Sequence, residues 1–408
     1  MFFVPQGPRR RRRPLVAPLG AALVLVLLAG GIWLGGHPDW LPGPVRDALV
    51  SDSDARLYDE AADVIQDDYY RKVDRKQLLD KALGSAVDSL GDRFSTYFDP
   101  KAYRSFEEAT QGAFEGVGMN VEEVPAGLRV LTVFKGSPAA RGGLKSGDEI
   151  IAVNGRSLRG ASSEEATTRI KGRAGTKVKL SVVTGKAKPR VVVLERAKVD
   201  VPVVESRMAR TPAGEKVAYV KLSSFTSGAH GEVGKAVRHL LGKGAKDVVL
   251  DLRDNGGGLL NEAVLVSSIF LPDGKIVSTR GRSRPERVFE ATGSSISTKV
   301  PVAVLVNGES ASASEIVTGA LQDRDRATVV GTRTFGKGVF QEIKRLSNGG
   351  ALDITVGEYF TPKGRNLGGG GPKKGAGITP DVAARDNDKT KRDETLGAAL
   401  KTLGRGHA

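Results

Sequence analysis

The hydrophobic pattern changes several times along the chain and predicts separate structural units. Residues 15–36 carry no charged side chain and are mostly apolar. From residue 54 to about residue 90, apolar positions recur at helical spacing, which predicts two amphipathic helices. Between 112 and 199, short alternating runs predict a small β-rich domain. Beyond residue 217, apolar runs alternate with helical patterns, which predicts a partly parallel α/β sheet.

Apolar runs at 217–222, 246–252 and 302–306 are the predicted central strands of the α/β unit. The first two flank an amphipathic helix predicted at 232–241, and a strand–helix–strand unit is the crossover that joins parallel strands. A further run at 327–330 predicts another strand of the same sheet.

The strand predicted at 302–306 leads through an Asn-Gly turn into a serine-rich helix start. Ser310, Ser312 and Ser314 lie at this junction. A helix N-terminus offers unpaired N–H groups and a partial positive charge, and both favour a developing oxyanion. Lys337 follows later between two glycines, where the backbone can take tight conformations. The junction therefore suits a nucleophile.

A serine hydroxyl needs a base before it can attack a carbonyl. The four histidines (His37, His230, His239 and His407) do not lie in glycine-rich, motif-like settings. An amine can take this role when burial and neighbouring groups lower its pKa. The residues thus indicate Ser312 as nucleophile and Lys337 as base. A helix-capping serine and a solvated lysine are the plainer alternative that these residues alone leave open.

A second candidate element is the glycine run that follows the strand predicted at 246–252. It reads Asp254-Asn255-Gly256-Gly257-Gly258. Backbone N–H groups in such a run can bind a phosphate or an oxyanion. No Gly-Lys-Ser/Thr follows, so it is not a P-loop. A plain turn is the alternative.

Charge and cysteine content narrow the function classes. The net charge is +15, and five positive charges form the run Arg9–Arg13. The chain has no cysteine, which excludes disulfides, cysteine nucleophiles, thiolate metal sites and a lipoprotein anchor. The remaining positive charge is interpreted as surface charge that attracts anionic lipid or cell-wall polymers.

The N-terminus is predicted to be a signal anchor. Residues 15–36 would form a helix of ~33 Å, enough to span a bilayer. Arginines before such a span keep that end in the cytoplasm. We therefore expect a cytoplasmic basic tail at 1–14, a transmembrane anchor at 15–36, and an extracytoplasmic remainder that does not bind nucleic acid. A cleaved signal peptide is the alternative.

The stretch 301–341 resembles the C-terminal processing, or tail-specific, serine peptidases. Residues 310–315 are similar to the nucleophile motif of that family, and residues 334–338 are similar to its lysine motif. The resemblance implies that Ser312 attacks, that Lys337 is the base, and that Gln341 orients the lysine. It also implies that the N–H groups of two residues hold the oxyanion, namely Gly257 and Ala313. Gly256 stands where the family usually has proline.

Residues 111–200 look like a PDZ domain. Two short sequences carry this resemblance: Gly-Ser-Pro-Ala-Ala at residues 136–140 and Gly-Asp-Glu-Ile-Ile-Ala-Val-Asn-Gly at residues 147–155. PDZ domains bind a peptide by adding it to a sheet edge and holding its terminal carboxylate. The helix predicted at 163–170 would form one wall of the groove. The implied carboxylate-binding loop and first edge are Glu115, Gly116, Val117, Gly118 and Met119. A PDZ domain that only packs against its neighbour is the alternative.

The resemblance runs from about residue 57 to 382 and implies an α/β multidomain protein. Linker and N-terminal helices at 37–110 precede the PDZ domain, and a C-terminal tail at 386–408 follows a crotonase/Clp-protease-like core at 201–385. The implied function is a membrane-anchored extracytoplasmic serine endopeptidase, gated by the PDZ domain, that cleaves protein C-termini or partly unfolded chains.

No cofactor or metal is implied, and the N-terminal helices could pair two copies of the chain. Two other function classes are open. One is a PDZ scaffold on an inactive peptidase core, which would lack Ser312 or Lys337, and both are present. The other is acyl-thioester chemistry on a crotonase-like fold, against which the anchor and the Ser-Lys pattern argue.

Overall fold

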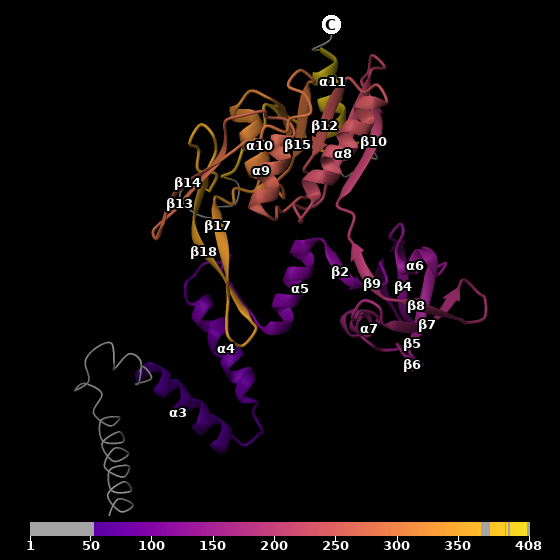
Figure 1. The fold of residues 1–408 in the computed structure, drawn as a ribbon, viewed down its shortest axis with the longest axis vertical. Helices are drawn as coiled ribbons and strands as arrows, with labels where there is room; N and C mark the ends of the chain where they lie inside the picture. The colour runs from indigo at the N-terminus through magenta and orange to yellow at the C-terminus, as the bar shows by residue number, and fades with distance from the viewer. Residues whose placement is uncertain (1–52, 369–375, 388, 391, 406–408) are drawn as a thin grey trace, which may run out of the picture. The chain divides into compact units, whose positions relative to one another are not determined.

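The computed structural model describes residues 53–368, 376–387, 389–390 and 392–405 (Figure 1). The chain divides into two compact units, one ending at Ser85 and one beginning at Ala86. Within the described residues, no helix is both long and apolar enough to cross a membrane. The predicted tail at 1–14 and anchor at 15–36 lie outside the described residues.

The predicted N-terminal helices are confirmed as α3 (Ser53–Asp68) and α4 (Arg75–Asp88). The Arg75 guanidinium joins them by contacting the carboxylates of Asp59, at 2.9 Å, and Asp63. A face of α3 with Leu57, Val64 and Ile65 is exposed. These two ion pairs bridge the helices at the protein surface.

A six-stranded sheet is the centre of the C-terminal domain. Its order is β10-β11-β12-β15-β16-β19; β10 is antiparallel to β11, and every other neighbouring pair is parallel. The predicted strand–helix–strand crossover is confirmed as β11–α8–β12. The strands are β10 (Val204–Arg210), β11 (Lys216–Leu222), β12 (Asp247–Asp251), β15 (Val302–Val306), β16 (Thr328–Gly331) and β19 (Val382–Ala383).

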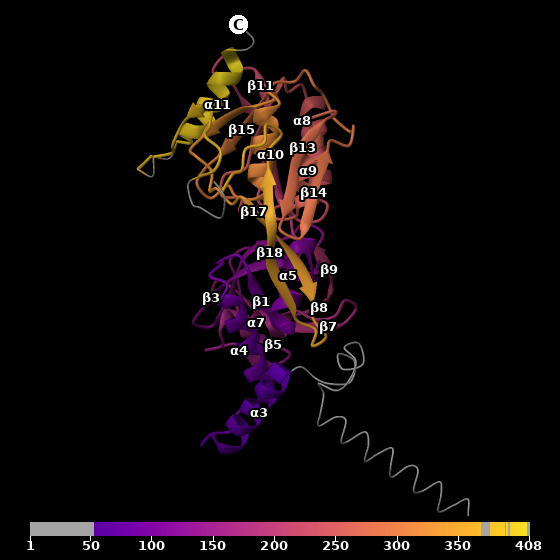
Figure 2. The same cartoon turned by 90° about the vertical axis from the view of Figure 1, so that its left-hand side faces the viewer.

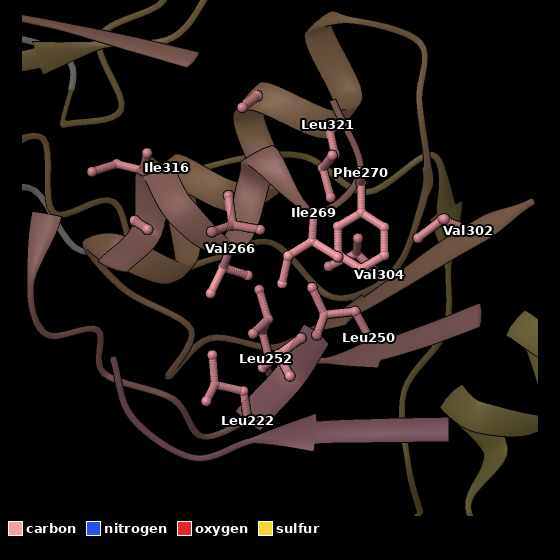
Figure 3. Close-up of a cluster of buried hydrophobic side chains, with 14 of the residues drawn as sticks. Leu222, Leu250, Leu252, Val266, Ile269, Phe270, Val302, Val304, Ile316 and Leu321 are labelled. Atoms are coloured by element: carbon pink, nitrogen blue, oxygen red, sulfur yellow. The ribbon is translucent and has the colours of Figure 1, made fainter. Parts of the chain in front are cut away.

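Helices cover both faces of this sheet, which explains why its central strands β12 and β15 are buried along their whole length. Helices α8 (Ala229–Gly242), α9 (Leu260–Ser268) and α10 (Ala313–Asp323) lie on one face, and α11 (Glu394–Arg405) lies on the other (Figure 2). Even-numbered strand residues such as Leu222, Leu250 and Val304 pack under α9 and α10 (Figure 3). Odd-numbered residues such as Val249 and Leu305 pack against α11. The segment predicted as a C-terminal tail at 386–408 thus contains a helix that is part of this domain's packing.

A second, antiparallel sheet carries the lysine loop at its edge. Its order is β1-β18-β13-β14, with β17 also paired to β18. The strand β1 precedes the predicted β-rich domain in sequence, yet Thr96 pairs with Asp353 of β18. The strands are β1 (Thr96–Phe98), β13 (Lys275–Gly281), β14 (Arg284–Glu290), β17 (Val339–Arg345) and β18 (Ala351–Phe360).

The predicted β-rich domain is a five-strand antiparallel path, β3-β4-β5-β7-β8, with β6 on β5. Its core includes Leu128, Ile150 and Leu180. The predicted helix start is confirmed, because the Ser162 hydroxyl accepts from the Glu165 N–H. The elements are β3 (Met119–Val124), β4 (Gly127–Val133), α6 (Pro138–Arg141), β5 (Asp148–Val153), β6 (Arg156–Ser157), α7 (Ser163–Ile170), β7 (Lys177–Thr184) and β8 (Arg190–Glu195).

One short strand pair connects this domain to the rest of the chain. Strand β2 (Ala113–Gly116) enters the domain and β9 (Ala197–Asp200) leaves it, and the two are antiparallel partners. Helix α5 (Pro100–Gln111) precedes them, with Asp99 as its N-cap and Pro100 at its first position.

Candidate active site

Ser312 lies at the turn between β15 and α10, in a strained backbone conformation. Its φ is 56° and its ψ is −114°, and it is one of four non-glycine residues with positive φ in the described part of the chain. A side chain held in such a conformation points to a functional site. The strained turn places the serine at the N-terminus of α10, where N–H groups gather.

The two neighbouring serines have structural hydrogen bonds. Both Ser310 and Ser314 are fully buried. The Ser310 hydroxyl donates to the Leu252 carbonyl at 2.7 Å, and the Ser314 hydroxyl donates to the Asn255 carbonyl at 2.8 Å. Ser312 keeps partial exposure. Of the three serines, Ser312 is therefore the one available to a substrate.

The buried carboxylate of Glu315 joins the nucleophile turn to the lysine loop. Its Oε2 accepts from the N–H of Ser312 at 3.0 Å and from the N–H of Lys337 at 2.9 Å. Its Oε1 accepts from the N–H of Gly336 at 2.8 Å and from the Thr334 hydroxyl at 2.6 Å. Burial raises the pKa of Glu315, and these four donors offset part of that effect. One side chain thus fixes two backbone segments that are distant in sequence.

Lys337 is largely shielded from solvent, and burial lowers the pKa of its amine. The carboxylates of Asp353 and Asp92 act in the opposite direction. The Lys337 Nζ lies 4.6 Å from the centroid of the Phe94 ring. A lysine with a lowered pKa can act as a base, as the sequence predicts.

The structure does not join the predicted dyad and Gln341 by side-chain hydrogen bonds. Within the described residues, the Lys337 Nζ makes no hydrogen bond to Ser312 or to Gln341. The Gln341 amide donates to the Thr355 hydroxyl at 2.9 Å. The three residues occur on adjoining elements. Gln341 is in β17, which directly follows the lysine loop, and Glu315 connects that loop to the Ser312 turn. Alignment of the side chains would need rotation of the lysine.

The glycine loop lies against the nucleophile turn. A Cβ built on Gly257 would lie 2.8 Å from the Ser312 Cβ and 3.0 Å from the Ala313 nitrogen, so only glycine fits there. The φ of Gly257 is 106°. The predicted oxyanion groups, Gly257 and Ala313, are therefore brought together beside Ser312. The Gly257 N–H, however, donates to the Asn255 Oδ1 at 2.9 Å.

Tyr359 is a buried polar residue that sequence reasoning missed. Its side chain is 1% exposed, and its hydroxyl makes no standard hydrogen bond in the described part of the chain. Ser312 is its polar neighbour, and burial raises the pKa of the phenol. Tyr359 belongs to β18. Glu315 lies within the predicted nucleophile motif at residues 310–315, but its hydrogen bonds to the lysine loop can be recognised only in the folded structure.

The predicted peptide-binding residues are divided between two strands. Glu115 and Gly116 are in β2, Val117 and Gly118 form the connection, and Met119 begins β3. A Cβ on Gly118 would lie 2.4 Å from the Ser137 Cβ, so this connection requires glycine. The edge strand β3 is tied to the start of α7 by the Ser163 N–H, which donates to Glu123 at 2.8 Å.

No group of three or more His, Cys, Asp or Glu side chains in the described ranges is arranged to hold a metal ion.

Comparison with known families gives two matches along the chain. Residues 216–384 match peptidase family S41, and residues 109–183 match the PDZ domain. The first range contains Ser312, Lys337 and the glycine loop. The second contains the edge strand and the connection at Gly118.

Relatives match over most of the chain. The carboxy-terminal processing protease CtpA of Bacillus subtilis is 34% identical over 398 residues, which are 95% of this chain and 81% of the relative. The carboxy-terminal-processing protease of Bartonella bacilliformis is 36% identical over 78% of this chain and 72% of its own length. A solved structure of an S41-protease-like protein from Bacteroides fragilis has a TM-score of 0.50 at 19% identity, over 85% of this chain and 95% of that protein. This last likeness concerns the fold alone.

Proposed function

Because this chain belongs to peptidase family S41, as a carboxy-terminal processing serine protease with a PDZ domain, we propose that Ser312 and Lys337 are its catalytic dyad. The observation that carries the proposal is the strained, partly exposed Ser312 between two buried, hydrogen-bonded serines. Glu315 supports it by holding the Ser312 and Lys337 amides on one carboxylate oxygen.

The proposed reaction begins with the neutral Lys337 amine. The Ser312 Oγ attacks the carbonyl carbon of the substrate, and its proton passes to Lys337. The N–H groups of Gly257 and Ala313 stabilise the oxyanion of the tetrahedral intermediate. The lysine ammonium then protonates the leaving amine, and the acyl group stays on Ser312. The again neutral lysine then deprotonates a water molecule, which attacks the acyl carbonyl. The lysine ammonium returns this proton to the Ser312 Oγ as the ester bond breaks, and the new C-terminus is released.

Two rearrangements separate the described site from this reaction. The Lys337 Nζ must leave the Phe94 ring and approach the Ser312 hydroxyl, where Gln341 would hold it. The Gly257 N–H must exchange the Asn255 oxygen for the substrate oxyanion. Glu315 holds the backbone N–H groups of Ser312 and Lys337 during both changes. We propose that the described site is the resting form and that substrate drives its alignment.

We propose that the PDZ domain gates this site by binding the substrate's C-terminus. Among the strands of the described residues, none pairs with the outer side of its edge strand β3, which suits addition of a peptide strand. The implied substrates are protein C-termini and partly unfolded chains, which can supply an extended segment. The N-terminal helices α3 and α4 would pair two copies of the chain.

The test of the dyad is cleavage of a fluorophore-labelled denatured protein by the full-length chain in detergent, beside Ser312→Ala and Lys337→Ala. We expect both variants to lose activity and to unfold like the parent. Activity that survives in either variant would show that the dyad is misassigned. Binding of peptides with small apolar C-termini, without any cleavage by the parent, would favour the scaffold function instead.

The same assay gives the pH dependence of the base. Lysine works as a base only when neutral, and burial lowers its pKa below the usual 10.5. Activity should therefore rise with pH through that lowered value and level off above it. A rate that does not change with pH over the range in which the protein stays folded would contradict a lysine base.

We further propose that residues 15–36 anchor the protein in the cytoplasmic membrane with the catalytic part outside. The charge-free run and the preceding arginines are the basis of this proposal. In a bacterial host, the parent should stay in the membrane fraction through a high-salt wash. Leu25→Arg should weaken that retention. Recovery of the parent in the soluble fraction would exclude an intact anchor.

A further inference from the structure

A loop outside both family matches forms one side of the lysine site. The matches cover residues 109–183 and 216–384. Residues 92–95 precede both and connect α4 to β1. Strand β1 pairs with β18 at Thr96–Asp353, and this pairing carries the loop to Lys337. Residues far ahead of the peptidase core in sequence thus reach its proposed base.

Phe94 makes the most direct contact in this loop. The Lys337 Nζ lies 4.6 Å from the centroid of its ring. The other neighbour of the ring is Phe335, in edge contact with a centroid distance of 6.5 Å, and the Arg93 guanidinium lies over both rings. An aromatic face attracts an ammonium group, and more strongly when both are shielded from water. The ring therefore favours the protonated lysine in its present position.

A chain of hydrogen bonds links the same loop to Gln341. The Ser95 hydroxyl donates to Asp92 at 2.7 Å and accepts from the Thr355 N–H at 3.0 Å. The Thr355 hydroxyl in turn accepts from the Gln341 amide at 2.9 Å. Ser95 is buried, so this chain is held in a defined geometry. The loop is thus connected to the residue that would orient the lysine as well as to the lysine.

The charges around the lysine come from four residues. Asp353 of β18, Asp92 of the loop and Glu315 of α10 favour the ammonium form, and Arg93 disfavours it. Hydrogen bonds from Thr355, Ser95 and the Phe94 N–H outweigh burial and hold the pKa of Asp92 below its usual range. Asp92 therefore remains a carboxylate that faces Lys337 at neutral pH.

We propose that the loop of residues 92–95 positions the proposed base, with Phe94 holding Lys337 in its resting place and Asp92 positioning Gln341 through Ser95 and Thr355. This inference rests on the proposed Ser312–Lys337 dyad. In it, Phe94 and Asp92 do not touch the substrate. They hold the base in its resting place and set how readily it loses its proton.

The test compares Phe94→Leu with the parent by measuring kcat/KM across the pH range in which activity rises. Leucine keeps an apolar side chain but has no aromatic face. The protonated lysine should lose stabilisation, and the rise should move to lower pH by about half a unit or more. Phe94→Tyr keeps the aromatic face and should restore the parent profile. Asp92→Asn removes a negative charge and should move the profile in the same direction.

Phe98→Leu is the matched control. Phe98 lies four residues further along the same segment, and its ring stacks on Phe106 at 5.0 Å and not on Lys337. Its removal should leave the position of the pH profile unchanged, whatever its effect on stability.

A purely structural role for the loop would lower activity by the same factor at every pH. If Phe94→Leu and Asp92→Asn behave in that way, the inference is wrong even when Ser312→Ala and Lys337→Ala are inactive. If Lys337→Ala retains activity, the dyad itself fails, and that result is visible without the Phe94 variants. Should Phe94→Leu not fold, the Asp92→Asn profile alone decides the matter.

Discussion

At the scale of residues, the backbone of Ser312 is the least relaxed part of the proposed site. Its φ of 56° and ψ of −114° suit glycine, and a serine there adopts them only because the surrounding structure requires it. The turn is held by Glu315, by the Ser310 hydroxyl and by contact with Gly257. The strained backbone of Ser312 thus lowers the stability of the fold at the position where the hydroxyl is needed.

This strain can be measured with two variants that both lack the hydroxyl. Ser312→Gly should be more stable than Ser312→Ala by about 1 kcal/mol or more, because only alanine retains a Cβ in the strained conformation. Urea unfolding of the two proteins gives the difference. Equal stabilities would mean that the turn is relaxed, and both variants should be inactive.

The nucleophile could be predicted from sequence because its motif is local. Three serines at a strand-to-helix turn, followed by a lysine between glycines, are visible without a structure. The residues indicated Ser312 and the resemblance implied the same serine, but neither gave a physical reason to exclude Ser310 or Ser314. The structure adds the physical reason, since the Ser310 and Ser314 hydroxyls donate to carbonyls in the loop that follows β12. Such partners are distant in sequence and leave no periodic signal.

At the scale of elements, Glu315 makes the start of α10 and the lysine loop one rigid unit. Glu315→Gln keeps the shape but replaces one acceptor oxygen with an NH₂ group that faces backbone donors. At least one buried N–H then loses its partner, and we expect about 2 kcal/mol of destabilisation. Activity should fall even in conditions where the variant is fully folded. Thermal unfolding and cleavage rates, measured on the same sample, check both effects.

Full activity in a folded Glu315→Gln protein would show that the backbone positions do not depend on this carboxylate. Thr318→Val is a suitable control, because the Thr318 hydroxyl only bonds the Ser314 carbonyl within the same helix. It should change stability slightly and leave the cleavage rate unchanged.

The glycine loop offers a matched pair of neighbouring positions. A Cβ at Gly257 would collide with Ser312 and Ala313, whereas a Cβ at Gly256 would meet nothing within 4 Å. Gly257→Ala should therefore abolish cleavage, and Gly256→Ala should keep it. Gly256→Ala should also stabilise the fold by about 0.4–1 kcal/mol, because its φ is not positive and the unfolded chain loses freedom. Loss of activity in Gly256→Ala alone would contradict this assignment.

Elements were predictable where their pattern was strong. The central strands β11, β12 and β15 are short, apolar and β-branched, and their positions follow from sequence. Helix α9 was missed because its residues are apolar on most sides, and buried helices of this kind lack helical periodicity. The hairpin β13–β14 was missed because β14 is mostly polar and exposed.

At the scale of the whole molecule, Arg253 joins the central sheet to the C-terminal helix. Its guanidinium contacts the fully buried Asp251 at 2.6 Å and reaches Asp386 and Asp393, near the start of α11. Arg253→Met would leave Asp251 buried with an uncompensated charge, so we expect a loss of about 3 kcal/mol or more. Asp393 is 39% exposed, and Asp393→Asn should be much milder. Chemical denaturation of both variants gives the comparison.

Similar losses of unfolding free energy in Arg253→Met and Asp393→Asn would mean that the buried charge of Asp251 is not the main cause of the destabilisation. A loss in Arg253→Met without any change in cleavage before unfolding would show that α11 stabilises the sheet and does not act on the glycine loop.

The arrangement of the domains along the chain could be predicted only from the resemblance to a known peptidase family. Periodicity predicted a β-rich segment and an α/β segment, but not that β1 at residues 96–98 pairs with β18, more than two hundred residues later. Sheet pairing between distant segments depends on the complete fold. The loop of residues 92–95 was therefore given no role at the site from the sequence, and it lies beside Lys337 in the structure.

The strand pair that bounds the PDZ domain has a practical consequence. The Val201 N–H donates to the Gly112 carbonyl at 2.7 Å, so the chain enters and leaves the domain at almost the same point. A domain whose two ends lie close together can be replaced by another such domain without distorting the rest of the protein. The protease could then be rebuilt as a sensor, in which a foreign recognition module, grafted between residues 112 and 201, decides when peptide bonds are cut.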